Sequence, residues 1–82
     1  MIDQNSSIEV YTTRNCGYCR AAKRVLDLRG LKYIEYDVTL NDVKREEMMR
    51  RSNRRTVPQI FIDGESIGGY QELAQLLAEQ QR

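Results

Sequence analysis

The chain contains no histidine, a single proline and only two cysteines among its 82 residues. Without imidazole it has neither a histidine general base nor a histidine metal ligand. It also lacks a run of about 18 apolar residues, so no segment is predicted to span a membrane. The net charge of +1 argues against bulk attraction to nucleic acid or to a membrane surface as the main role.

The length predicts one domain, covering residues 1–82, near the small end of chains that fold alone. Residues 1–7 are polar, and we expect them to form a loose N-terminus. They lack the basic start and apolar stretch of a secretory signal, which predicts a cytoplasmic, reducing location. A lone cysteine pair in that compartment is more typical of redox chemistry than of a structural staple.

Hydrophobic alternation and turn residues predict seven elements along the chain. Strands are expected at residues 8–12, 32–38 and 59–62, and a fourth begins at Ser66 after an Asp63-Gly64 turn. Helices are expected at residues 18–29, 42–52 and 70–80. Gly30 should end the first helix, and Asn41 or Thr39 should cap the second.

The apolar periodicity predicts which side chains point into a core. Either Tyr33 or Ile34 should point inward from the second strand. The helical residues expected to face inward are Ala21, Ala22, Val25, Leu26, Leu28, Val43, Met48, Leu73, Leu76 and Leu77.

The order of these elements is βαβ, then α, then ββα. The first two strands should pair in parallel through a right-handed crossover, and the hairpin should close the same sheet. This pattern predicts an α/β thioredoxin fold, in which three helices flank a four-stranded mixed sheet.

The two cysteines lie in the segment Cys16-Gly17-Tyr18-Cys19, where the first strand gives way to the first helix. A helix N-terminus carries unpaired N–H groups and a partial positive charge, which favour a thiolate. Cysteines in such positions have pKa values of about 3.5 to 7.5. Cys16 is therefore the predicted nucleophile, with Arg14, Arg20 and Lys23 as nearby cations. Cys19 should be more buried and should attack a disulfide formed on Cys16.

Two other interpretations of the cysteine pair are weaker. Half of a zinc site would need further ligands, and zinc usually takes four, whereas this chain has two cysteines and no histidine. A structural disulfide that closes so short a loop would remove little chain entropy.

Three segments in order make the chain resemble the glutaredoxins, especially the short bacterial dithiol type, over nearly all of residues 8–77. The segments are Tyr11-Thr12 to Cys19, Thr56-Val57-Pro58-Gln59-Ile60-Phe61-Ile62, and Ile67-Gly68-Gly69.

The resemblance implies reduction of protein disulfides and glutathione mixed disulfides, with Cys16 as nucleophile, Cys19 as resolving thiol and glutathione as electron donor. Pro58 would be cis and face the cysteines, and the backbone of Val57 would hold the cysteinyl part of glutathione. The start of the last helix would bind the γ-glutamyl carboxylate. The full set of implied glutathione-binding residues is Arg14, Tyr18, Arg45, Thr56, Val57, Pro58, Gly69, Tyr70, Gln71 and Glu72.

Three positions depart from the usual family pattern. Gly17 replaces a proline, which loosens the helix start and predicts a shifted reduction potential. Thr13, with Arg14 beside it, replaces a lysine. The run from Tyr70 to Glu72 replaces smaller or acidic residues, and γ-glutamyl selectivity depends on this run.

The resemblance also leaves alternatives open. Small residues at position 17 are associated in the family with a [2Fe–2S] cluster shared by two chains, each giving its first cysteine and a glutathione. Otherwise we expect a monomer. A redoxin supplied by a thioredoxin reductase is a third hypothesis, and ribonucleotide reductase is a family-typical protein substrate.

Overall fold

The structure, a computed structural model, describes residues 2–80 of the chain as seven elements. The strands are Ile8–Thr12 (β1), Ile34–Asp37 (β2), Gln59–Ile62 (β3) and Glu65–Gly68 (β4). The helices are Gly17–Leu28 (α1), Asp42–Ser52 (α2) and Tyr70–Gln80 (α3). Among these helices, none has the length and apolar character needed to cross a bilayer.

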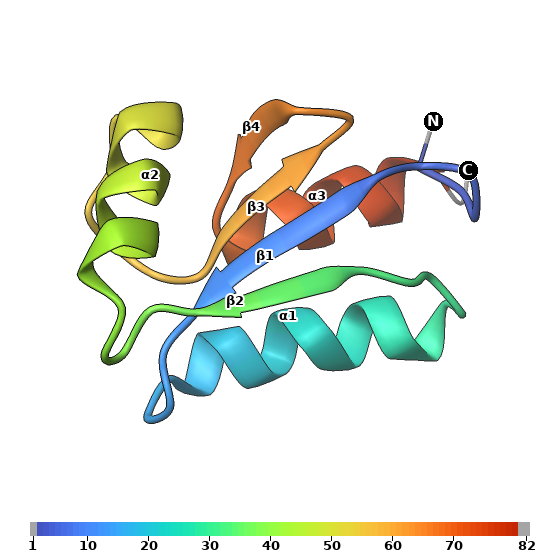
Figure 1. The fold of residues 1–82 in the computed structure, drawn as a ribbon. Coiled ribbons are helices and arrows are strands. Elements are labelled where there is room, and N and C mark those ends of the chain that lie inside the picture. The colour runs from blue at the N-terminus through green and yellow to red at the C-terminus, as the bar shows by residue number, and fades with distance from the viewer. Residues whose placement is uncertain (1, 81–82) are drawn as a thin grey trace.

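The four strands form one mixed sheet in the order β2-β1-β3-β4 (Figure 1). β1 pairs in parallel with β2, and the pairs β1–β3 and β3–β4 are antiparallel. The predicted thioredoxin fold is therefore confirmed. The antiparallel register of β1 with β3 places Tyr11 opposite Gln59, so the C-terminal end of β1 lies beside the start of β3.

Two apolar clusters hold helices on opposite faces of the sheet (Figure 1). On one face, Ala22 and Leu26 of α1 and Leu73 of α3 join a cluster with the strand residues Val10 and Ile60. On the other face, α2 covers the cluster of Tyr11, Val38, Met48 and Phe61. This alternation along β1 is what the period of two in a strand requires.

The second helix begins and ends as its local sequence predicts. Asn41 is the N-cap, and its Oδ1 accepts a hydrogen bond from the Lys44 N–H at 3.0 Å. Asn53 ends the helix in a left-handed conformation with φ of 58°.

Several predicted inward positions are wrong. Val43 is 76% exposed, because α2 packs on the sheet through Met48 and Met49 instead. Leu28 ends α1 and is 77% exposed. Leu76, on α3, is 36% exposed. Tyr33, which precedes β2, packs against the α1–α3 cluster, whereas Ile34, the first residue of β2, is exposed.

The N-terminal residues that the structure describes are not loose. Ile2 is buried in the α1–α3 cluster, and its N–H donates to Gln80 Oε1 at 2.6 Å. Gln80 Nε2 donates in return to the Ile2 carbonyl. The Ser7 N–H donates to Asp63 Oδ1 at 2.9 Å. The buried Ile2 side chain and these hydrogen bonds together attach the segment to the domain.

Arg51 joins α2 to the strand that leads to the cysteines. Its guanidinium donates to both carboxylate oxygens of Glu9, at 2.8 and 3.0 Å, and to the Tyr11 hydroxyl at 2.7 Å. It also lies 4.0 Å from the centre of the Phe61 ring. The bidentate bond to Arg51 lowers the pKa of the Glu9 carboxyl. Burial, together with the hydrogen bond to Glu47, raises the pKa of Tyr11 to about 12.

This pairing predicts an acid-dependent stability. Because the folded pKa of Glu9 is depressed, its contribution is present above the unfolded value of 4.5 and is lost as the pH falls through the folded value. Glu9→Gln should lower the free energy of unfolding by about 1 to 3 kcal/mol at pH 7. It should also flatten the loss of stability below pH 4.5, measured by urea unfolding at a series of pH values. Glu79→Gln, on the exposed face of α3, is the matched control, and identical pH profiles for both variants would contradict the assignment.

Candidate active site

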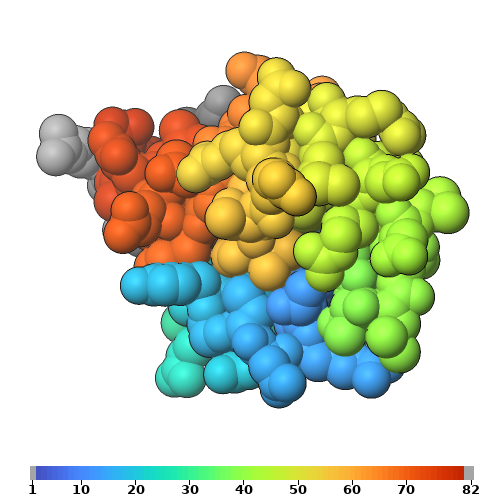
Figure 2. Space-filling view, turned by 90° about the vertical axis from the view of Figure 1, so that its left-hand side faces the viewer, coloured from blue at the N-terminus to red at the C-terminus, as the bar shows by residue number. Residues whose placement is uncertain are grey.

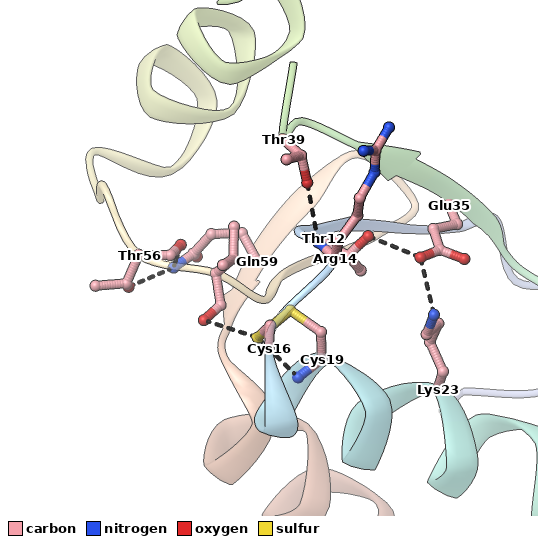
Figure 3. The surroundings of a disulfide bond; sticks show 10 residues. Thr12, Arg14, Cys16, Cys19, Lys23, Glu35, Thr39, Thr56 and Gln59 are labelled. Atoms are coloured by element: carbon pink, nitrogen blue, oxygen red, sulfur yellow. Dashed lines mark hydrogen bonds and ion pairs between the residues drawn. A yellow bond between two sulfur atoms is a disulfide. The ribbon is translucent and has the colours of Figure 1, made fainter. Parts of the chain in front are cut away.

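Cys16 occupies the N-cap of α1, a few residues after the end of β1. Its backbone is extended, with φ of −134° and ψ of 106°, and its Sγ accepts the Cys19 N–H at 3.1 Å (Figure 3). No acidic side chain lies in the first turn of this helix. The Cys16 sulfur therefore lies at the positive end of α1, without a neighbouring carboxylate on that turn to oppose an anion.

The two cysteines differ in access as predicted. Cys16 and Cys19 form a disulfide in the structure, with their Cα atoms 5.2 Å apart (Figure 3). Cys16 is half-buried, whereas Cys19 is 1% exposed beneath the helix start. An incoming thiol or disulfide can therefore reach Cys16 first.

The loop before β3 faces the disulfide. The carbonyl oxygen of Val57 lies 3.8 Å from Cys16 Sγ, and the Val57–Pro58 peptide bond is cis, as predicted. Pro58 is buried, while Thr56 is exposed and Val57 is half-buried. The backbone of Val57 is thus presented beside the reactive sulfur.

Gln59 fixes the shape of this loop. Its side chain is fully buried, and Nε2 donates to the carbonyl oxygen of Thr56 at 3.0 Å and to its Oγ1 at 3.2 Å (Figure 3). Oε1 of Gln59 has no hydrogen-bond partner among the described residues. Gln59 was not among the predicted site residues. The available signal was a polar side chain in a strand that otherwise reads as buried.

A groove of about 190 Å³ opens beside these elements, and we call it the central groove. It lies where the first turn of α1, the loop before β3 and the start of α3 come together on the face shown in Figure 2. Eight of the ten predicted glutathione-binding residues line it, together with Arg54: Tyr18, Thr56, Val57, Pro58, Gly69, Tyr70, Gln71 and Glu72.

The far end of the central groove is built around the two glycines before α3. Gly68 has φ of 116°, a backbone conformation that favours glycine, and a Cβ there would lie 2.6 Å from Glu72 Oε1, so that side chain would have to move. The same Glu72 oxygen accepts the Gly69 N–H at 2.6 Å and lies 3.5 Å from Arg54 Nη1. The Gly69 hydrogen bond, reinforced by Arg54, lowers the pKa of Glu72. This end of the groove therefore holds an ionised carboxylate, a guanidinium and the N-terminus of a helix.

Arg14 and Arg45, the other two predicted residues, do not line the central groove. Arg14 extends towards Asp37 at 3.8 Å, and its N–H donates to Thr39 Oγ1. Arg54 is the cation that the groove contains. It follows Asn53, the residue that ends α2, and its one distinguishing signal in the sequence is its place two residues before Thr56.

Lys23, expected to help stabilise a Cys16 thiolate, instead pairs with Glu35. Its Nζ donates to Glu35 Oε2 at 3.0 Å, and the same oxygen accepts the buried Thr12 hydroxyl at 2.7 Å (Figure 3). The charge of Lys23 is thus largely balanced by Glu35. The start of α1 remains the main source of positive potential at Cys16.

Comparison with known proteins identifies the family. The profile of the glutaredoxin family matches residues 8–67. The chain belongs to the glutaredoxin family. It is 47% identical over 68 residues to glutaredoxin 3 of Escherichia coli strain K12, a match that covers 83% of this chain and 82% of that relative. The thiol–disulfide oxidoreductase activity expected of the cysteine pair follows from this membership.

Solved glutaredoxin structures share the whole architecture. The buckwheat glutaredoxin–glutathione complex superimposes with a TM-score of 0.82 at 25% identity, covering 94% of this chain and 73% of that one. The solution structure of glutaredoxin from Brucella melitensis gives a TM-score of 0.76 at 38% identity, covering 89% and 79%. The disulfide and the groove described above therefore lie in a glutaredoxin fold.

The N-cap position of Cys16 predicts a stable thiolate in the reduced protein. Thiolate ultraviolet absorbance should persist well below pH 8.5, the approximate midpoint of an ordinary cysteine. Cys16→Ser should abolish this absorbance at neutral pH, and Cys19→Ser should retain it. An ordinary titration midpoint for the Cys19→Ser variant would contradict the role assigned to the start of α1.

Proposed function

We propose that this glutaredoxin reduces protein disulfides and glutathione mixed disulfides at the expense of glutathione. The observation that supports this most is the placement of Cys16, the accessible sulfur of the pair, at the edge of a groove with charged and backbone groups at its far end. The glutaredoxin family uses glutathione, and the buckwheat relative binds it. We take its location to be the cytoplasm and its working form to be a monomer.

Glutathione offers a cysteinyl centre flanked by two carboxylates and one ammonium group. In the proposed complex its cysteinyl backbone lies along Val57, in the manner of an added strand. One carboxylate is received by the first backbone N–H groups of α3, at Tyr70 and Gln71, beside Arg54. The ammonium group is attracted by Glu72. Arg14 and Arg45 lie outside the groove and remain candidates for the second carboxylate.

The reaction begins when the Cys16 thiolate attacks the glutathione sulfur of a mixed disulfide. A bond forms between Cys16 and glutathione, the original disulfide breaks, and the substrate thiol leaves and takes up a proton. A second glutathione then releases Cys16 as a thiolate and departs as glutathione disulfide. For a protein disulfide, the Cys16 thiolate bonds to one substrate sulfur and frees the other as a thiol. Cys19 then attacks Cys16 Sγ, the bond from Cys16 to the substrate breaks, and the second substrate thiol leaves, which produces the Cys16–Cys19 disulfide seen in the structure. Two glutathione molecules reduce that disulfide by two successive exchanges and leave as glutathione disulfide.

This scheme assigns separate tasks to the two cysteines. Cys16→Ser should abolish all turnover. Cys19→Ser should retain reduction of a small glutathione mixed disulfide but lose most reduction of protein disulfides. Both reactions are followed as NADPH consumption coupled through glutathione and glutathione reductase. Equal loss of both reactions in Cys19→Ser would contradict the assignment, and activity only with a thioredoxin reductase would replace glutathione as the donor.

Arg54 should contribute to glutathione binding through its charge at the end of the central groove. Arg54→Gln should raise the KM for glutathione by about 2- to 5-fold, the range of a partly exposed ion pair. The kcat should change little, because Arg54 does not contact the reacting sulfurs. Arg50→Gln removes the same charge from an exposed position on α2 and is the matched control. An equal KM change in both variants would indicate general charge attraction rather than a groove contact.

The iron–sulfur alternative requires a second chain. Within residues 2–80, no group of three or more histidine, cysteine, aspartate or glutamate side chains could hold a metal. Cys16 is the reachable sulfur, and Cys19 is covered. One chain therefore does not suffice for a cluster, and Gly17 is the one residue that favours a shared one. The dithiol reductase remains the function we propose.

The natural protein substrate follows less directly from the site. A partner must present a disulfide or a glutathionylated cysteine on an exposed segment that can reach Cys16. Ribonucleotide reductase, expected from the family resemblance, is one proposed substrate of this kind.

A further inference from the structure

A second hollow lies next to the central groove, and we call it the apolar hollow. It measures about 390 Å³ and is lined by Gly17, Tyr18, Ala21 and Tyr70. The rings of Tyr18 and Tyr70 stack with centroids 5.8 Å apart and planes inclined by 29°. Both tyrosines also line the central groove, so the stacked rings form a wall shared by the two depressions.

The apolar hollow is continuous with the redox site. Gly17 follows Cys16 directly in the chain, and the first turn of α1 lies against the start of α3 on the face shown in Figure 2. A Cβ at position 17 would make one ordinary van der Waals contact, with Arg20 Nη2 at 3.9 Å. Glycine thus leaves the hollow uncovered beside the reactive cysteine. Tyr18 is 63% exposed, so much of its ring is available to a ligand.

The chemistry of the two depressions is opposite. The central groove holds Arg54, Glu72 and the N-terminus of α3, whereas no charged side chain lines the apolar hollow. Glutathione carries three charged groups and no apolar side chain, so it has nothing to place in the hollow. A polypeptide substrate does, because its reacting cysteine is followed and preceded by other side chains.

We propose that the apolar hollow binds an apolar or aromatic side chain that flanks the reacting cysteine of a polypeptide substrate. This proposal rests on the glutathione-dependent function argued above. In the step concerned, the Cys16 thiolate bonds to the glutathione sulfur of a glutathionylated peptide. The peptide–glutathione disulfide breaks, and the peptide cysteine leaves as a thiolate that takes up a proton from solvent. The peptide lies in the hollow while its glutathione lies in the central groove.

The test compares two glutathionylated peptides that differ only beside the cysteine, one with leucine or phenylalanine and one with serine or glutamine. The wild-type enzyme should have a kcat/KM about 5- to 10-fold higher for the apolar peptide, as partial burial of one such side chain would give. Ala21→Gln fills the hollow with a neutral polar group and should bring this ratio close to one. Ala78→Gln, the same change on the exposed face of α3, should leave the ratio at the wild-type value.

A small glutathione mixed disulfide without a peptide serves as the internal reference. Ala21→Gln should turn it over at the wild-type rate, because Ala21 lies outside the central groove. Equal kcat/KM values for the two peptides in the wild-type enzyme would overturn the proposal, and so would an apolar preference that survives Ala21→Gln. If the wild-type enzyme turned over neither the peptides nor the small disulfide, the glutathione-dependent function itself would fail.

Discussion

The hydrogen bond from the Cys19 N–H to Cys16 Sγ is the contact on which the site depends. It makes a sulfur atom the N-cap of α1, a position usually held by a side-chain oxygen. The cap requires an extended residue at the strand–helix junction, and the parallel pairing of β1 with β2 fixes where that junction lies. From there the antiparallel register of β1 with β3 brings the Val57 carbonyl to the same sulfur. Reactivity and ligand placement thus come from one junction in the sheet.

Much of this arrangement could be predicted because it depends on local sequence. The cap at Asn41 and the bounds of α2 and α3 follow from side-chain and backbone preferences within a few residues. The βαβ order restricts the sheet to few topologies. The placement of the Pro58 loop beside Cys16 was an implication of the family resemblance. The remaining groove residues came from the family resemblance rather than from the pattern.

The errors concern features that depend on packing between elements. Val43 has the right spacing to be buried, yet α2 packs on the sheet through Met48 and Met49 and leaves Val43 in solvent. Arg51 of α2 instead forms an ion pair with Glu9 on β1. Hydrophobic periodicity cannot predict a contact between two charged side chains. Arg54 reaches the groove only because Asn53 turns the chain through a left-handed conformation after α2. Sequence spacing alone does not predict the direction that the chain takes after α2.

The stacked rings of Tyr18 and Tyr70 have a thermodynamic consequence. A single pair of side chains bounds two depressions of opposite polarity, so a ligand that reorients the rings on one side alters the surface offered on the other. Occupancy of the two sides is then linked, and by reciprocity each ligand changes the affinity for the other by the same factor. The order in which thiols bind and leave would then depend on the Tyr18–Tyr70 pair, although neither ring takes part in the exchange of bonds.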